Sequence, residues 1–267
     1  MAKTEPGHYL QTEQGRVFYQ VHGPQGAPGV VLTHGVAMDH RTFAPQVEVL
    51  KDDFRVVTWD MPFHGRSDPL DKSRAFSATS AELLAKLLDS LGIEKAVFVG
   101  LSLGSYITRL MSIHHPERVR AEVHVSGSSM HTTYPKFLRA MIPLIKITFK
   151  LLPESMMARM FASNKALKDE TVAYLVEAVQ QTGKDGLTHL MCEMIRDMTV
   201  PLPEPAEMPR LIVYGDHEKP FVIKASIAWH ERVPGSELVE VQDAHHIVNQ
   251  DNPQAFNAAL LAFLQQL

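Results

Sequence analysis

Short apolar runs alternate along the chain with segments whose apolar residues recur at helical spacing. Runs such as 29–33 (GVVLT) and 96–100 (AVFVG) are continuously apolar and rich in valine, which is typical of strands buried on both faces of a sheet. The turn signal Gln14-Gly15 predicts a hairpin near the start of the chain. Strands alternating with helices predict an α/β protein with a mainly parallel eight-stranded sheet flanked by helices. The predicted strands are residues 8–11, 16–21, 29–33, 54–59, 96–100, 121–126, 210–214 and 237–241.

Helical periodicity is clearest over residues 79–91, where leucines form one apolar face and Gly92 follows as a stop signal. Thr79 and Glu82 have the spacing of a capping box, so we expect this helix to begin at Thr79. A second helix is predicted at 103–114. The last one begins near Pro253, with Asn252 as its N-cap.

The alternation stops between residues 128 and 203, where no convincing strand pattern occurs. This stretch predicts three or four helices, and the proline-rich segment 201–209 (PLPEPAEMP) predicts a hinge after them. A helical block between two strands of one sheet predicts a cap that lies over the sheet. We therefore expect a core formed by residues 1–127 and 204–267, and a cap formed by 128–203. The helices expected in the cap are residues 134–151, 154–163, 168–182 and 186–197.

Composition and charge narrow the class of protein without indicating its chemistry. The chain has 267 residues and a formal net charge of −4, with no block of like charge, which argues against nucleic acid and anionic membranes as partners. No apolar run approaches the roughly 20 residues that span a bilayer. The start of the chain lacks the apolar stretch of a secretory signal. The single cysteine, Cys192, forbids an internal disulfide, so a cytoplasmic location is expected. Nothing in the pattern sets an oligomeric state.

The predicted cap differs from the core in its methionine content. Eight of the 13 methionines fall within residues 128–203. Methionine is flexible and polarisable, so these side chains could present an adaptable apolar wall to a substrate or fill the packing of the cap itself. Lys136, Lys146 and Lys150 are expected to form a solvated face.

The chemistry of the chain is indicated by Gly100-Leu101-Ser102-Leu103-Gly104, a Gly-x-Ser-x-Gly pattern between a predicted strand and a predicted helix. This pattern is typical of a nucleophile elbow, a sharp turn that holds a serine in a strained conformation at the end of a strand. Gly100 and Gly104 keep side chains out of the bend. The amide of Leu103, at the start of the helix, is placed to stabilise negative charge.

With this motif and its context, the chain resembles the α/β-hydrolase superfamily, in particular its serine-nucleophile, carboxylesterase-like branch with a helical cap. The resemblance covers nearly the whole length. Phe63 departs from the family pattern, which has glycine there. The segments that carry the resemblance, besides the elbow, are THGVAMD (33–39), WDMPFHGRSD (59–68), HHPERVRAEVHVSG (114–127), LIVYGDHEKP (211–220) and DAHHIVNQDNPQAF (243–256).

The resemblance implies a catalytic triad in the chain order serine, acid, histidine. The family histidine precedes a proline by seven residues, and Pro253 is seven residues after His246, so His246 takes the place of the base and His245 that of a usual glycine. The family acid stands three residues after the loop glycine, which points to Glu218. Asp216 remains the alternative acid.

An oxyanion hole needs two convergent N–H donors. Leu103 supplies one of them. By resemblance the second is Val36, after His34 and Gly35, where the glycine lets the backbone approach the substrate oxygen. His34 is expected to hold this loop rather than to carry a proton.

These residues predict a serine hydrolase that cleaves carboxylic esters of small to medium, mostly apolar substrates through an acyl-enzyme. A lactonase or a carbon–carbon bond hydrolase could use the same triad, and a catalytically slow ligand-binding protein is a further alternative. Because the nucleophile is serine, the dehalogenase and epoxide hydrolase branches, which use aspartate, are disfavoured. No metal or organic cofactor is required, and the expected partner is a small-molecule ester or lactone.

Overall fold

The computed structural model describes residues 7–203 and 206–267. Its sheet has the strand order β1-β2-β4-β3-β5-β6-β7-β8. β1 and β2 form an antiparallel hairpin, β2 pairs antiparallel with β4, and all the remaining pairs are parallel. The predicted mainly parallel eight-stranded sheet is therefore confirmed. The strands are β1 (His8–Thr12), β2 (Gly15–His22), β3 (Gly29–Thr33), β4 (Arg55–Trp59), β5 (Ala96–Leu101), β6 (Val119–Val125), β7 (Arg210–Gly215) and β8 (Ser236–Val241).

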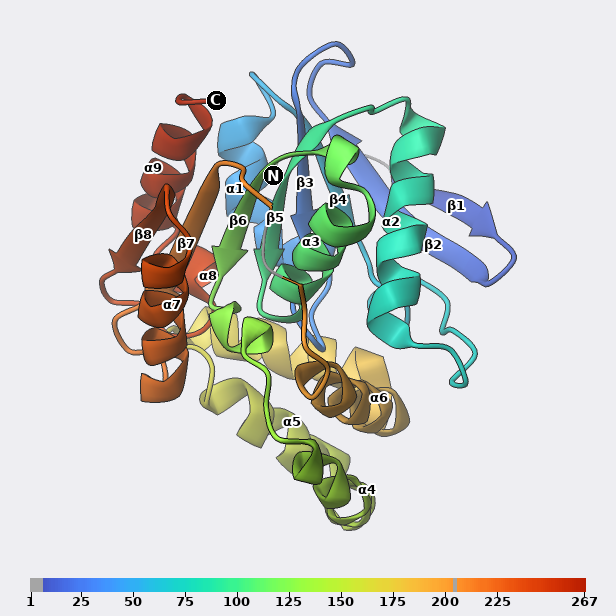
Figure 1. Ribbon diagram of the computed structural model, residues 1–267. Coiled ribbons are helices and arrows are strands. Elements are labelled where there is room, and N and C mark those ends of the chain that lie inside the picture. Colours follow the sequence, from blue (N-terminus) through green and yellow to red (C-terminus); the bar gives the residue numbers. More distant parts are fainter. Residues whose placement is uncertain (1–6, 204–205) are drawn as a thin grey trace.

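Helices cover both faces of the sheet (Figure 1). Side chains alternate along each strand, so Val31 packs with α2 and α3 on one face, whereas Val30 and Leu32 pack with α1 and α9 on the other. This double burial explains why the central strands are continuously apolar. The helices of the core are η1 (His40–Phe43), α1 (Ala44–Leu50), α2 (Phe76–Leu91), α3 (Leu103–His114), η2 (Pro116–Arg118), α7 (Pro220–Arg232), α8 (Val248–Asp251) and α9 (Pro253–Leu264).

The prediction of the helix ends succeeded at α9 and was wrong at α2. At α9 the side chain of Asn252 accepts a hydrogen bond from the amide of Ala255 at 3.1 Å, as an N-cap does. α2 begins at Phe76, three residues before the predicted start, and the amide of Thr79 already bonds to the carbonyl of Ala75. Thr79 is thus inside the helix and is not its cap. The buried Phe76 side chain draws the first turn into the core.

The residues between β6 and β7 form helices and no strand within the described range. These are η3 (Ser128–His131), η4 (Lys136–Met141), α4 (Ile142–Leu151), α5 (Glu154–Ser163) and α6 (Asp169–Met198). α6 is interrupted at Gly183, whose φ is 72°, so its halves correspond to the two helices predicted there. α4, α5 and α6 form a layer beyond one edge of the sheet (Figure 1), as the predicted cap requires.

The cap leaves and re-enters the core at two neighbouring strands. β6 pairs directly with β7, and the Arg210 guanidinium donates to the Glu122 carboxylate at 2.6 Å between them, with both side chains buried. Within the predicted hinge 201–209, residues 204 and 205 lie outside the described residues, as do the predicted core boundary at 204 and residues 1–6. No helix in the described ranges is both long and apolar enough to cross a membrane.

Candidate active site

The predicted catalytic residues meet at one edge of the sheet. Because β3, β5, β7 and β8 are parallel neighbours or near neighbours, their carboxyl ends deliver four loops to the same place. The loop after β3 carries His34 to Val36, and the turn after β5 carries Ser102. The loop after β7 carries Glu218, and the loop after β8 carries His246.

The turn at Ser102 has the strained geometry of a nucleophile elbow. Ser102 has φ 53° and ψ −112°, a conformation that a non-glycine residue rarely adopts, and its amide donates to the carbonyl of Val125 at 2.8 Å. A Cβ at Gly100 would lie 2.3 Å from the carbonyl oxygen of Gly104. A Cβ at Gly104 would lie 2.1 Å from that of Thr33. Both glycines are therefore needed for α3 to begin directly against β3 and β5.

Ser102, His246 and Glu218 form a continuous hydrogen-bonded chain. His246 Nε2 lies 2.9 Å from Ser102 Oγ, and His246 Nδ1 lies 2.5 Å from Glu218 Oε2. An ionised carboxylate can only accept, so Nδ1 carries the imidazole proton and Nε2 is free to accept the serine proton. The three side chains are buried, with exposed fractions of 6%, 7% and 5% in that order.

The charges around this chain favour ionised glutamate and neutral histidine. Burial opposes ionisation of Glu218, but the adjacent His246 and a hydrogen bond from the Lys219 amide outweigh it and lower the pKa of Glu218 to about 2. Burial, and then the nearby Lys165 ammonium, lower the pKa of His246 despite the attraction of Glu218. A neutral imidazole beside the serine is the form that acts as a base.

Asp216, the alternative acid, faces other partners. Its Oδ1 accepts a hydrogen bond from the backbone amide of Ala244 at 3.0 Å, and its Oδ2 lies 3.7 Å from His217 Nε2. The amide of His217 in turn donates to the carbonyl of Ala244 at 3.0 Å. These bonds fasten the loop after β7 to the loop after β8. The structure thus brings Glu218 to His246, and it gives Asp216 a place between the two loops.

The loop after β3 is held by a histidine with a defined tautomer. The Met61 amide donates to His34 Nε2 at 2.9 Å, so the proton lies on Nδ1, which donates to the carbonyl of Gly35 at 2.8 Å. The Gly35–Val36 peptide is trans, and its N–H therefore points away from that carbonyl. Gly35 lies beside the nucleophile, because a Cβ there would be 3.2 Å from Ser102 Cβ. His34 thus bonds both to its own loop and to the backbone that follows β4.

Lys165 is a residue of this site that sequence reasoning missed. It belongs to the cap, between α5 and α6, and its carbonyl accepts a hydrogen bond from the amide of Ile247, directly after His246, at 3.1 Å. The residue is half-buried, and its ammonium lies 5.1 Å from the ring centroid of Phe161. Burial lowers the pKa of Lys165 to about 8. No motif marks this lysine, since a contact between a cap loop and the histidine loop exists only in the folded chain.

A second serine–histidine–carboxylate chain lies beneath the elbow. Ser105 Oγ is 2.7 Å from His124 Nδ1 and 2.9 Å from His131 Nε2, and His124 Nε2 is 3.3 Å from Glu122 Oε2. Ser105, His124 and Glu122 each have an exposed fraction of 0%. A substrate cannot reach this serine, so a catalytic role is disfavoured. The network instead joins α3 to β6 and to the start of the cap.

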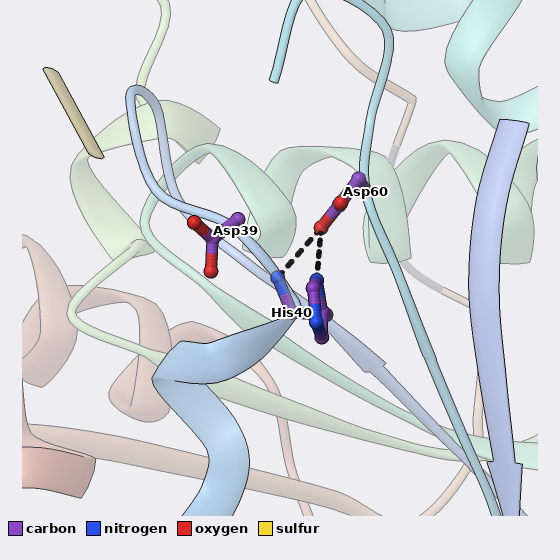
Figure 2. A group of neighbouring side chains, drawn as sticks. All are labelled: Asp39, His40 and Asp60. Atoms are coloured by element: carbon purple, nitrogen blue, oxygen red, sulfur yellow. Dashed lines mark hydrogen bonds and ion pairs between the residues drawn. The ribbon is translucent and has the colours of Figure 1, made fainter. Parts of the chain in front are cut away.

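Three possible metal ligands gather where the chain leaves β3 and β4 in the described part of the chain, with donor atoms within 4.8 Å of one another: Asp39, His40 and Asp60. Figure 2 shows that Asp60 Oδ1 bonds to both the amide and the ring Nδ1 of His40, at 2.7 and 2.8 Å. Asp60 Oδ2 accepts from the Arg66 amide, and Asp39 is ion-paired with Arg41. These carboxylate oxygens already bind protein groups, so the cluster is better explained as a structural contact that holds the loop than as a metal site.

Comparison with known proteins agrees with this geometry. The chain is 25% identical over 265 residues to 3-oxoadipate enol-lactonase 1 of Acinetobacter baylyi, covering 97% of each protein. It is 25% identical over 277 residues to carboxylesterase YbfK of Bacillus subtilis, covering 96% of this chain and 86% of the relative. A thermophilic esterase from Thermogutta terrifontis superposes with a TM-score of 0.85 at 19% identity, covering 98% of each chain, which shows the fold. The model of the alpha/beta hydrolase fold family matches residues 28–253. The chain therefore belongs to the α/β-hydrolase family.

Proposed function

We propose that the protein is a serine hydrolase that cleaves carboxylic esters of small to medium, mostly apolar substrates, with Ser102, His246 and Glu218 as its triad. The observation that carries this proposal is the hydrogen-bonded chain of 2.9 and 2.5 Å that joins the three residues at a strained elbow. The family membership and the hydrolases among the relatives support it.

In the proposed reaction, Ser102 Oγ attacks the ester carbonyl while His246 Nε2 takes the serine proton. Glu218 holds the imidazole tautomer and stabilises the imidazolium that forms. The amides of Leu103 and Val36 receive the oxyanion, each contributing on the order of 3 kcal/mol to the lowering of the barrier. His246 then protonates the leaving alcohol, and a water that it activates releases the acid from Ser102.

Lactone ring opening is the second candidate, and a specific observation favours it. The enol-lactonase relative is matched over 97% of both chains. A lactone is a cyclic ester, so the same residues would open it, and the acid and alcohol would leave as one molecule. Carbon–carbon bond hydrolysis stays a prediction from the triad alone.

We also propose that residues 128–203 act as the cap over a core of residues 1–127 and 204–267. Hydrogen bonds between the two parts hold the cap in place over the core. The Asp39 amide donates to the Tyr174 hydroxyl at 3.0 Å, and the Leu167 amide donates to Asp251 Oδ1 at 3.1 Å. The cap is thus fastened to the loop after β3, which carries Val36, and to α8, which follows the loop of His246. Cytoplasm remains the expected location.

A fluorophosphonate probe and an aryl ester assay test the mechanism. We expect the probe to label Ser102 and the protein to turn over the ester. Ser102→Ala should abolish labelling and lower kcat by about 10⁴-fold or more. Ser105→Ala is the matched control, because Ser105 is buried and does not belong to the hydrogen-bonded chain of Ser102, His246 and Glu218. This variant should remain reactive to the probe. Turnover that persists unchanged in Ser102→Ala would overturn the mechanism.

A panel of aryl esters, alkyl esters and lactones against the purified protein then separates the two candidates. The ester proposal expects the highest kcat/KM on an acyclic ester. A lactone that exceeds every ester by tenfold or more in kcat/KM would move the assignment to a lactonase.

A further inference from the structure

The cap exposes a continuous apolar stripe that the catalytic proposal does not use. Phe137, Met141, Leu144, Ile147 and Leu151 follow one another at spacings of three or four residues along η4 and α4. Such spacing places side chains on one face of a helix. Phe137, Leu144 and Leu151 are 71%, 60% and 77% exposed, values far above those of core residues. We call these five residues, together with the exposed Met156 and Met160 of α5, the cap stripe.

The cap stripe lies on the side of α4 opposite to the side that packs against the rest of the cap. On the opposite side of α4, Ile142 is buried and Phe149 packs against the main hydrophobic cluster. α4 lies at the end of the cap farthest from the sheet (Figure 1). The helix therefore has one face that contributes to folding and a second apolar face that no described residue covers. Exposed apolar surface of this extent is typical of an interaction site.

Positive charge accompanies the cap stripe. Residues 136–160 contain five basic side chains and one acidic one, although the whole chain has a net charge of −4. Lys136, Lys150 and Arg159 are exposed and form no ion pair with any described residue. The net charge of the whole chain does not reveal this local excess of positive charge. The argument from composition against anionic membranes as partners therefore does not hold for this segment.

The exposed apolar stripe and the positive charge beside it together favour one kind of partner. A second copy docked face to face would place the same cations opposite one another, which is unfavourable. Protein interfaces are also depleted in lysine. A helix with an apolar stripe bordered by lysines is typical of a segment that lies in the interface of an anionic bilayer.

We propose that the cap stripe docks on an anionic lipid surface, with its apolar side chains in the acyl boundary and its lysines among the headgroups. This inference is independent of the proposed function, since it uses no catalytic residue. It is tested on the full chain, in both the unaltered protein and the Ser102→Ala variant, so a failure of the catalytic proposal leaves it intact.

Co-sedimentation with phosphatidylcholine–phosphatidylglycerol vesicles measures the docking. We expect both proteins to bind these vesicles and to bind pure phosphatidylcholine at least about tenfold more weakly. Phe137→Ser combined with Leu151→Ser should reduce the affinity about tenfold or more. Lys136→Glu combined with Lys150→Glu should reduce this affinity roughly thirtyfold or more. Added salt should likewise weaken the binding of the unaltered protein to the anionic vesicles.

Phe221→Ser is the matched control, because Phe221 is 54% exposed on α7 and is outside the cap stripe. It should bind vesicles like the unaltered protein, and an unchanged thermal unfolding midpoint should show that each variant is folded. Equal binding by the control and the stripe variants would overturn the proposal, as would no binding to anionic vesicles. Self-association that is lost in Phe137→Ser/Leu151→Ser would also overturn it in favour of a second copy.

Discussion

Glu218 and Asp216 lie two residues apart on one loop, yet their carboxylates face different partners. We expect Glu218→Gln to lower kcat by roughly 10⁴-fold, because an amide cannot hold the imidazole in the required tautomer or stabilise its charge. Asp216→Asn should cost far less, since its amide oxygen can still accept the hydrogen bond from Ala244. Steady-state kinetics on an aryl ester compares the two. The opposite ranking would transfer the role of the acid to Asp216.

Lys165 gives the site a testable dependence on pH. In the proposed mechanism activity requires neutral His246, so we expect the acid limb of the kcat/KM profile to report the pKa of that residue. Burial and then Lys165 lower this pKa, and removing the cation should therefore raise it. We expect the acid limb of Lys165→Met to move to higher pH, with activity lost first at mildly acidic pH. Lys165→Arg keeps the charge and is the control. An unmoved limb in Lys165→Met would show that the ammonium does not act on His246.

At the scale of residues, the sequence predicted those members of the site that a short motif carries. Ser102 is fixed by its two glycines, and His246 by its distance from Pro253. For the acid, the family spacing pointed to Glu218 and left Asp216 as the alternative, and the contact of Glu218 with His246 and of Asp216 with Ala244 became visible only in the folded chain. Lys165 had no local signal at all, since its contact with Ile247 joins two distant loops.

The elbow is an element whose shape depends on the absence of side chains. Gly104→Ala would place a methyl group 2.1 Å from the Thr33 carbonyl oxygen and 2.7 Å from that of His34, and neither backbone can move freely. We expect a loss of about 1–3 kcal/mol in the free energy of unfolding, together with reduced kcat from displacement of the loop after β3, which carries the proposed oxyanion donor Val36. Urea denaturation and ester kinetics measure the two effects.

Gly26→Ala provides the comparison for this substitution, because a Cβ there meets nothing within 4 Å. It should leave both stability and kcat unchanged. If Gly104→Ala behaved like Gly26→Ala, the close approach of α3 to β3 would not be a requirement of the fold.

Elements were predictable where their apolar pattern is dense. All eight strands and the interruption of α6 near Gly183 agree with the sequence pattern. α7 was not predicted, because it buries only Val222, Ser226 and Trp229 and leaves Phe221 and Ile227 exposed, so its periodicity is weak. The start of α2 was set by the burial of Phe76, a tertiary effect that overrode the local capping signal.

At the scale of the whole molecule, the core buries histidines in neutral form, and this links folding to pH. Burial and the neighbouring His34 ring lower the pKa of His64 from its ordinary value of 6.5 to about 3. Between those values the unfolded chain binds the additional proton, so the stability from His64 is full above about pH 6.5 and declines as the pH falls. Burial also lowers the pKa of His34, His124, His131 and His246.

We therefore expect the free energy of unfolding to fall as the pH is lowered from 7 to 5. His64 alone should contribute about 1.4 kcal/mol per pH unit, or about 2 kcal/mol between pH 6.5 and 5. Asp197, whose pKa burial raises to about 6, acts in the opposite direction but is one group against several imidazoles. Urea unfolding at a series of pH values measures the slope. His64→Asn should make it shallower by about 1.4 kcal/mol per pH unit, whereas His114→Asn controls for the loss of an exposed histidine. An identical slope in His64→Asn would mean that His64 is not held neutral by the fold.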